Sequence, residues 1–247
     1  IKILDMKKQS FGTWLTIYSE AVAEILATAG YDWITVDLEH TPISLSQAEK
    51  LVRVIDLAGA KPYVRVSSNN AAEIKKVLDF GAKGIIVPMV NSAQEVSTVL
   101  DAAFYPPVGN RGMGLYRAQG YGEAKSKQTY ISQIASEIEV FVQIESKLAV
   151  EKIEEIFDNP ITGYFLGPYD LSASIGKPAE FNAEEFLQLE QKVLETAKKF
   201  DIQRGIHIVE PDPKLIADKV RIGYDTIAYS VDFRMLDVMA RQPFEDA

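Results

Sequence analysis

Two carboxylates follow apolar, strand-like stretches of the chain at the point where each stretch ends. Glu145 closes the run Val140–Glu145, and Asp170 stands just beyond Tyr164–Leu166 and the Gly-Pro pair after it. If these runs are neighbouring parallel strands, both carboxylates reach the same rim of the sheet. Adjacent carboxylates repel unless a positive charge lies between them, and a divalent cation is the usual partner. The pair therefore predicts a metal site of hard oxygen ligands, suited to Mg²⁺ or Mn²⁺.

Other polar side chains stand at or near the ends of further strand-like runs. These candidates are Asp37, Glu39, His40, Arg65, Gln143, His207 and Glu210. The first three could form an exposed turn, but His40 is one of only two histidines, which favours a role in chemistry. Arg65 lies inside an apolar strand, so it either pairs with Asp37 or Glu39 or holds a substrate carboxylate through two N–H groups. His207 could be a core histidine with its hydrogen bond satisfied or a contact for the substrate, and both remain open. Asp79 is expected to be an exposed acid at the end of a helix.

Lysine placement decides between a Schiff-base mechanism and a metal. A Schiff-base enzyme needs a lysine on a strand, buried enough for a lowered pKa. Lys61 and Lys83 fall at the wrong ends of their strands, and Lys147 stands at the start of a helix just past Glu145. With no cysteine in the chain, thiolate ligands and nucleophiles are also excluded. Metal-assisted chemistry is therefore the better hypothesis.

Apolar runs alternate with helical patterns from one end of the chain to the other. The predicted strands cover residues 13–17, 32–38, 61–66, 84–90, 138–145, 161–166, 203–209 and 225–231. Predicted helices cover residues 19–28, 46–57, 71–80, 149–157, 183–200 and 213–222, with two more that begin at 91 or 92 and at 232. Eight alternating pairs favour a closed (β/α)8 barrel of parallel strands over a doubly wound open sheet. No linker divides the chain, so residues 1–247 are expected to form one domain.

Composition and charge limit the classes of partner. The chain has 247 residues, 47% of them hydrophobic, and a formal net charge of −9, which is ordinary for a globular protein with a full core. Such acidity argues against nucleic acid or an anionic membrane as the main partner. No apolar run approaches the roughly 18 residues of a membrane span, and no signal-peptide pattern opens the chain, so a cytoplasmic location is expected.

An ordered set of short motifs resembles the HpcH/HpaI family of class II, metal-dependent pyruvate aldolases. The resemblance extends from Trp14 to about Val231. The motifs are Val36-Asp37-Leu38-Glu39-His40, Val64-Arg65-Val66, Ile86-Val87-Pro88-Met89-Val90, Tyr105-Pro106-Pro107 with Arg111-Gly112, Arg117-Ala118, Val142-Gln143-Ile144-Glu145 and Gly167-Pro168-Tyr169-Asp170-Leu171-Ser172. The resemblance implies a (β/α)8 barrel that reversibly cleaves 4-hydroxy-2-oxoacids into pyruvate and an aldehyde through a metal-stabilised pyruvate enolate.

The same resemblance implies a role for each matching residue. Glu145 and Asp170 would bind the divalent metal, which could be Mg²⁺, Mn²⁺ or Co²⁺. Arg65 and Gln143 would contact the pyruvyl group, whose carboxylate would meet the backbone N–H groups around Tyr169 and Asp170. His40 would transfer a proton, oriented by Asp37 or Glu39. The family commonly forms homohexamers in which the last helix, here about residues 232–243, packs on a neighbour. Asp79 would then reach an adjacent subunit's active site.

The aldehyde is the part of the substrate for which the resemblance gives least guidance. The segment Leu115–Gly122, within a long loop over residues 105–122, is expected to shape the aldehyde side of the pocket. Arg117 could meet a polar or anionic tail there. The polar stretch His207–Asp212 favours a hydroxylated substrate such as a 2-keto-3-deoxy sugar acid. Two other functions remain open, namely a CoA-thioester lyase of the citryl- or malyl-CoA type and a non-catalytic barrel.

Overall fold

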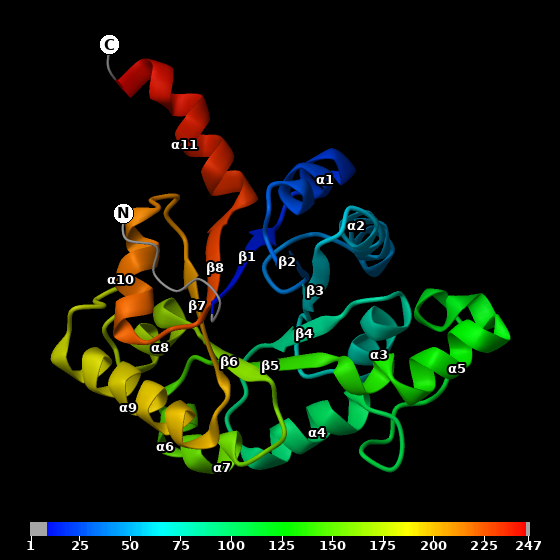
Figure 1. Cartoon of the computed structure of the whole chain (residues 1–247). Coiled ribbons are helices and arrows are strands. Elements are labelled where there is room, and N and C mark those ends of the chain that lie inside the picture. Colours follow the sequence, from blue (N-terminus) through cyan, green and yellow to red (C-terminus); the bar gives the residue numbers. More distant parts are fainter. Residues whose placement is uncertain (1–8, 246–247) are drawn as a thin grey trace.

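Eight parallel strands close into a barrel in the order in which they occur in the sequence (Figure 1). The protein is represented by a computed structural model that describes residues 9–245. The strands are β1 (Ser10–Leu15), β2 (Trp33–Asp37), β3 (Lys61–Arg65), β4 (Gly84–Val87), β5 (Glu139–Ile144), β6 (Gly163–Leu166), β7 (Gln203–Ile208) and β8 (Thr226–Val231). The predicted (β/α)8 barrel is confirmed. The single domain over residues 1–247 stays a prediction, and its first eight and last two residues lie outside the described part.

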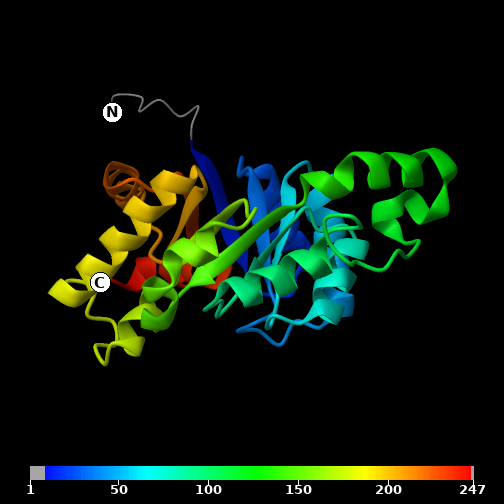
Figure 2. The ribbon, with the colours of Figure 1, turned by 90° about the horizontal axis from the view of Figure 1, so that it is seen from below.

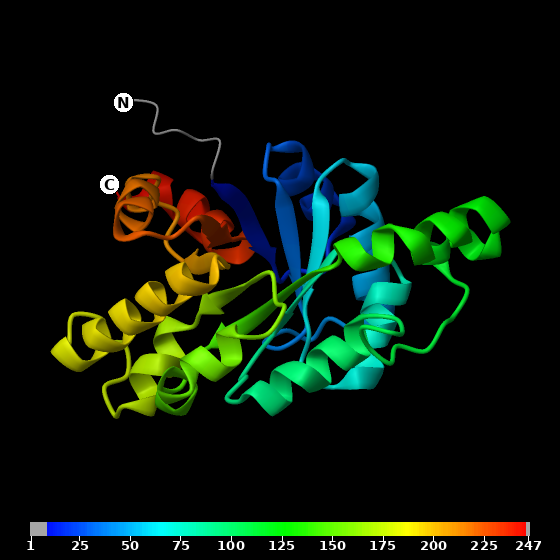
Figure 3. The same ribbon diagram turned by 60° about the horizontal axis from the view of Figure 1, so that its bottom comes forward.

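Helices lie on the outer side of the strands (Figures 2 and 3). They are α1 (Glu20–Thr28), α2 (Leu45–Leu57), α3 (Ala71–Asp79), α4 (Ala93–Ala103), α5 (Ala124–Ser132), α6 (Lys147–Glu151), α7 (Ile153–Phe157), α8 (Pro168–Ser174), α9 (Glu184–Phe200), α10 (Lys214–Ile222) and α11 (Asp232–Glu245). Side-chain caps begin several of them, as at Ser19 before α1 and Ser92 before α4. Gly30 and Gly59, which follow the C-caps of α1 and α2, have positive φ, a conformation in which glycine commonly ends a helix.

Three helical segments differ from the prediction. The helix expected over residues 149–157 is two short helices, α6 and α7, joined at Lys152, whose φ of −101° and ψ of 17° are not helical. The sequence pattern does not predict helix α8, because Gly167-Pro168 is expected only to end a strand. Proline at the first helical position also starts a helix, since its missing N–H needs no partner there. Helix α5, also not predicted, has a largely polar sequence with one buried side chain, Tyr130.

Alternation along each strand decides which side chains enter the barrel. On β5, Phe141 faces the interior, so Gln143 and the residue after the strand end, Glu145, lie on the same side. Aromatic side chains from neighbouring strands fill the middle of the barrel, where Trp33 stacks on Tyr63 with 5.2 Å between ring centroids. The polar residues follow one layer further along the strands, and Asp37 on β2 is in register with Arg65 on β3. The aromatic layer of the core therefore lies directly below the polar residues at the carboxyl ends of the strands.

Helix α11 leaves the barrel directly after β8 and extends away from it (Figure 1). Buried Asp232 ties its start to the end of β1, because its carboxylate accepts hydrogen bonds from the backbone N–H groups of Thr16 (3.0 Å) and Ile17 (2.7 Å). Phe233, Leu236 and Met239 are exposed on the helix. The expected last helix is confirmed, and its packing on a neighbour stays a prediction. Within residues 9–245, no helix combines the length and apolarity that a membrane crossing needs.

Candidate active site

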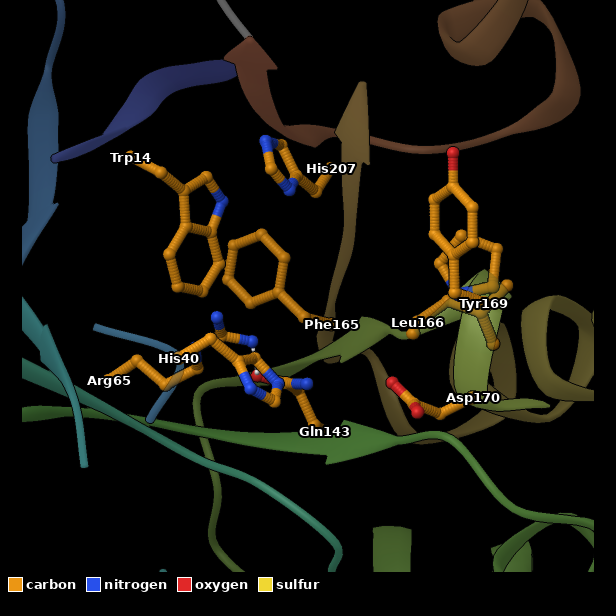
Figure 4. Close-up of a pocket in the computed structure, with 11 residues that line it drawn as sticks. Trp14, His40, Arg65, Gln143, Phe165, Leu166, Tyr169, Asp170 and His207 are labelled. Atoms are coloured by element: carbon orange, nitrogen blue, oxygen red, sulfur yellow. Dashed lines mark hydrogen bonds between the residues drawn. The ribbon is translucent and has the colours of Figure 1, made fainter. Parts of the chain in front are cut away.

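A cavity of about 240 Å³ opens at the carboxyl ends of the strands (Figure 4). Its wall includes Trp14, His40, Arg65, Gln143, Asp170 and His207. Figure 4 shows Asp170 and Tyr169 on one side of the cavity and Trp14 and His207 on another, with Phe165 between them in this view. Five of the strand ends that were predicted to carry chemistry thus contribute to one space.

Glu145 is held in one orientation by donors on both of its oxygens. The backbone N–H of Met89 donates to Oε1 (2.5 Å), and the side-chain amide of Gln143 donates to Oε2 (2.6 Å). Burial raises the pKa of Glu145, and the nearby carboxylate of Asp170 raises it further, while these two hydrogen bonds and Arg65 lower it. Asp170, in the first turn of α8, is exposed. A buried carboxylate and an exposed one therefore lie close enough at the rim for the charge of Asp170 to raise the pKa of Glu145.

These two carboxylates fit a hard cation that keeps most of its coordination positions for other ligands. Among residues 9–245, no group of three or more His, Cys, Asp and Glu side chains could hold a metal, so a closed protein cage is excluded there. Magnesium-like ions are commonly bound through one or two carboxylates, with water and substrate oxygens completing the shell. A cation at this position would also remove the repulsion that raises the pKa of Glu145.

Replacing Gly167 by alanine is expected to displace Glu145. A Cβ atom at Gly167 would lie 2.7 Å from Oε2 of Glu145 and 2.8 Å from its Cβ, although the φ of −97° suits alanine. We expect the affinity for Mn²⁺, measured by isothermal titration calorimetry, to fall by about tenfold or more. Gly112→Ala is the matched control, because its Cβ would meet only Lys75 Cδ at 4.0 Å. Unchanged affinity in Gly167→Ala would contradict a metal role for Glu145.

Arg65 is fixed by two carboxylates at once. Its Nε and one terminal nitrogen donate to the two oxygens of buried Asp37 (2.7 and 2.8 Å), and its other terminal nitrogen lies 3.0 Å from Oε2 of Glu39. That last nitrogen also donates to Oε1 of Gln143 (3.4 Å). The guanidinium lies over the ring of Trp14, 4.3 Å from its centroid. Arg65 can therefore pair with these carboxylates and still be available to a substrate, because the paired guanidinium lines the cavity.

His40 lies at the mouth of the cavity with its side chain exposed. Its Nε2 is 3.6 Å from Oε2 of Glu39, whereas both oxygens of Asp37 are taken by Arg65. Burial raises the pKa of Glu39, and the positive charge of Arg65 opposes that rise. Glu39 is thus the carboxylate next to the imidazole, and Asp37 acts on the site through Arg65.

His207 lies between the cavity and β8. Its Nε2 is 2.9 Å from the carbonyl oxygen of Ser230, and its ring packs against Trp14 with 5.3 Å between centroids. Burial lowers the pKa of His207 to about 4, with the charge of Arg65 acting in the same direction. The ring is therefore neutral near pH 7. His207 has a hydrogen-bond partner inside the protein, as a core histidine would, and it also lines the cavity.

The lowered pKa of His207 predicts a loss of stability in acid. The unfolded chain has a histidine pKa near ~6.5, so protons favour the unfolded state as the pH falls from about 6.5 towards 4. We expect this residue to cost about 1–2 kcal/mol of unfolding free energy at pH 5 relative to pH 7.5, measured by urea denaturation. His207→Gln should remove that difference, whereas His40→Gln, at an exposed position, should keep it. If the stability of His207→Gln depends on pH as the wild type does, the lowered pKa of His207 is contradicted.

Two predicted site residues lie elsewhere in the single chain. Arg117 donates to Asp56 (2.5 Å) in the last turn of α2 and to the carbonyl of Phe80 (3.4 Å) at the end of α3. Helices of this barrel run opposite to the strands, so these helix ends lie at the amino ends of the strands, away from the cavity. Neither Arg117 nor the rest of residues 115–122 lines the cavity or the space adjoining it. The expected place of this segment beside the aldehyde is not found within one chain.

Asp79 is paired, contrary to the exposed acid that the residues alone predicted. Its carboxylate accepts hydrogen bonds from buried Arg111 (2.6 Å) and from the side-chain amide of Gln119 (3.3 Å). The guanidinium of Arg111 also donates to the hydroxyl of Tyr130 (2.8 Å). The pair of Asp79 and Arg111 was not predicted, because the two residues lie far apart in the sequence. That Asp79 approaches the active site of an adjacent subunit stays a prediction.

Known proteins resemble this chain in both sequence and fold. The family model described as HpcH/HpaI aldolase/citrate lyase matches residues 10–236. The chain belongs to this family. A 2-keto-3-deoxy-L-rhamnonate aldolase of Klebsiella pneumoniae is 33% identical over 230 residues, which cover 89% of this chain and 84% of the relative.

Two solved structures resemble the whole barrel of this HpcH/HpaI family member. A family protein of Burkholderia cenocepacia J2315 superposes with a TM-score of 0.90 at 28% identity, covering 97% of this chain and 94% of the other. An HpcH/HpaI aldolase of Desulfitobacterium hafniense DCB-2 also gives 0.90, at 27% identity, with 99% and 95% covered. Aldolases and citrate lyases both cleave carbon–carbon bonds, so the prediction of a carbon–carbon lyase is confirmed.

Lys147 and Trp14 complete the account of this family member's site. Lys147 is exposed and bonded to Glu185 (3.0 Å), which raises its pKa, whereas a Schiff-base lysine needs a lowered pKa. Trp14 and Phe165 line the cavity but were not predicted as site residues. The sequence carried a usable signal for Trp14. Inward positions alternate along a strand, and Trp14 is the residue before the last one of β1.

Proposed function

We propose that this protein is a metal-dependent aldolase that reversibly cleaves a 4-hydroxy-2-oxoacid into pyruvate and an aldehyde. The observation that carries the proposal is the joint placement of Glu145, Asp170, Arg65 and Gln143 at one end of the barrel. The aldolase names of relatives at 33% identity support it and favour it over a CoA-thioester lyase or a non-catalytic barrel. The proposed substrate class is 2-keto-3-deoxy sugar acids, by analogy with those relatives.

Glu145 and Asp170 would hold the divalent cation. When bound, the cation supplies Lewis-acid polarisation of the substrate's 2-oxo group. Gln143 orients Glu145 through the hydrogen bond to Oε2, so its role includes positioning as well as contact with the pyruvyl group. The backbone N–H groups of Tyr169 and Asp170, in the first turn of α8, have no acceptor within the helix and are free to receive the substrate carboxylate.

Arg65 would stabilise the negative charge that develops on the 2-oxo oxygen during cleavage. Its fork on Asp37 fixes the guanidinium before substrate arrives, so that little reorganisation is needed as the charge appears. His40 would accept the proton of the 4-hydroxyl at Nε2, with Glu39 stabilising the resulting imidazolium. The C3–C4 bond then breaks, its electron pair forms the enolate of pyruvate, and the aldehyde leaves. Protonation at C3 completes pyruvate.

Several finer predictions belong to this proposal. The metal is expected to be Mg²⁺, Mn²⁺ or Co²⁺, and the assembly a homohexamer in which α11 packs on a neighbour and Asp79 approaches the neighbour's site. Arg117 could approach substrate only by such a route, since within one chain it pairs with Asp56. A cytoplasmic location also stays a prediction.

The test is pyruvate release from a panel of 4-hydroxy-2-oxoacids, first with EDTA and then with Mn²⁺ or Mg²⁺ restored. Release that disappears with EDTA and returns with metal is the expected result. Release that survives EDTA would overturn the metal mechanism. Failure of every substrate in the panel, with metal bound, would favour a CoA-thioester lyase or a binding role, and the formation of acetyl-CoA from malyl-CoA or citryl-CoA would separate these two.

A further inference from the structure

A second cavity adjoins the first at the Trp14 side. It measures about 360 Å³ and shares Trp14, His40, Arg65 and His207 with the cavity that contains Asp170. Its remaining wall combines five apolar residues with three polar ones. The apolar residues are Ile17, Pro42, Val209, Val231 and Phe233, and the polar ones are Thr16, Asp37 and Thr41. The two cavities therefore adjoin along the shared residues, with Asp170 in the wall of the first and a mainly apolar chamber formed by the second. Trp14 and His207 stand where the two parts meet.

The proton on His207 is assigned by its partner. A carbonyl oxygen only accepts hydrogen bonds, so the contact to Ser230 places the proton on Nε2 of the neutral ring. Nδ1 is then a lone-pair acceptor. Among residues 9–245, the only hydrogen bond of this side chain is the one through Nε2. In Figure 4, one ring nitrogen lies towards β8 and the other towards Trp14 and Phe165. The lowered pKa of His207 agrees with this neutral tautomer.

The Ser230 carbonyl is aimed at His207 by an unusual backbone conformation. Ser230 has a φ of +55°, in the left-handed region that few non-glycine residues adopt, and the β1–β8 register shifts next to it. Its hydroxyl donates to the carbonyl of Val209 (2.9 Å), and its carbonyl also accepts from Thr13 Oγ1 (3.3 Å). These bonds hold the carbonyl in place, so the tautomer of His207 is set by the fold.

Trp14 presents the complementary group. Its side chain is 96% buried, at 4% relative exposure, and its indole Nε1–H has no hydrogen-bond partner within the described residues. A buried N–H without a partner is energetically costly, so its presence on a residue of the cavity wall indicates that a ligand supplies the acceptor. Figure 4 shows the indole nitrogen on the side of the ring that faces His207.

We propose that Trp14 Nε1–H and His207 Nδ1 together bind one hydroxyl group of the substrate, on the aldehyde portion beyond C4. The proposal rests on the proposed function and names its substrate class as short hydroxyaldehydes. A hydroxyl can accept from the indole and donate to the imidazole at the same time, whereas a carboxylate cannot donate and a methyl group can do neither. The apolar chamber beyond the pair suits a short carbon chain with few further polar groups.

The experiment compares aldehydes that differ by one hydroxyl group. Addition of pyruvate to lactaldehyde and propanal, and to glycolaldehyde and acetaldehyde, is measured in the metal-loaded enzyme and in two variants. Trp14→Phe removes the N–H but keeps an aromatic ring, and His207→Leu removes the acceptor at similar volume. Exchange of the pyruvate methyl protons with D₂O reports the pyruvate half of the site without any aldehyde.

We expect the wild-type enzyme to prefer the hydroxylated member of each pair in kcat/KM. Each variant should lower that preference by about tenfold or more, through loss on the hydroxyaldehyde, and the rate of methyl exchange in each variant shows whether the pyruvate half of the site still operates. Equal rates on both members in the wild type, or an unchanged preference in a variant that still exchanges methyl protons, would overturn the inference and leave the aldolase standing. If no aldehyde adds to pyruvate and no exchange occurs in the wild type, the proposed function fails, and this inference with it. Trp14→Phe alone decides the matter if His207→Leu does not fold.

Discussion

Asp170→Ala is expected to abolish metal-dependent pyruvate release without unfolding the protein. The variant leaves Glu145 as the single proposed carboxylate ligand, and the loss of one of two charged ligands weakens the binding of a divalent cation. We expect the affinity for Mn²⁺ to fall by more than about 100-fold, since even residues behind the ligands typically contribute 10–100-fold. Pyruvate release should fall by at least about 10³-fold. Calorimetric titration and a coupled pyruvate assay measure the two effects.

Stability separates this loss from a folding defect. Asp170 is exposed and accepts no side-chain hydrogen bond from the described residues, and its charge raises the pKa of Glu145. Its removal relieves that repulsion, so the free energy of unfolding should stay within about 0.5 kcal/mol. Asp218→Asn, an exposed acid on α10 paired with Arg221, is the matched control and should change neither metal affinity nor activity. Full metal affinity in Asp170→Ala would show that the cation is held elsewhere.

Arg65→Met is expected to damage both the fold and the reaction, for different reasons. Asp37 is 1% exposed, and Arg65 supplies the hydrogen bonds to both of its oxygens. Without the guanidinium, the buried carboxylate of Asp37 keeps, among the described residues, only the backbone N–H of Glu39 as a donor (3.0 Å). Breaking a buried ion pair from one side costs about 3–5 kcal/mol of unfolding free energy, which urea denaturation measures. Pyruvate release should fall by about 10²–10³-fold, because the positive charge beside the 2-oxo group is lost.

A double variant distinguishes the two effects. Asp37→Asn combined with Arg65→Met removes the unpaired charge, so most of the lost stability should return, whereas activity should not. Arg221→Met, which removes an exposed ion pair, should change stability by less than about 0.5 kcal/mol. Recovery of activity in the double variant would mean that Arg65 serves only to pair with Asp37.

Local sequence determined the barrel and the rim. Apolar runs of strand length alternating with capped amphipathic helices are short-range patterns, and each predicts its element without knowledge of the rest of the chain. Two-residue alternation on β5 then placed Gln143 and Glu145 on the inner side, one layer beyond Phe141. The carboxyl ends of parallel strands meet at one edge, so the sequence also predicted that Glu145 and Asp170 lie at the same rim.

Only the tertiary structure decided which charged groups pair and which remain open to a ligand. Partners such as Arg117 with Asp56 and Arg111 with Asp79 lie far apart in sequence, and their meeting depends on where helix ends come to rest. The same holds for His207, whose tautomer depends on the carbonyl of Ser230 on the next strand. A hydrogen bond needs atoms within about 3 Å and a suitable angle, and strand-length patterns carry no information at that precision. The sequence by itself therefore determined the scaffold and the rim at which the two proposed ligands stand, while the tautomer of His207 and the unpartnered N–H of Trp14 emerged only from the folded barrel.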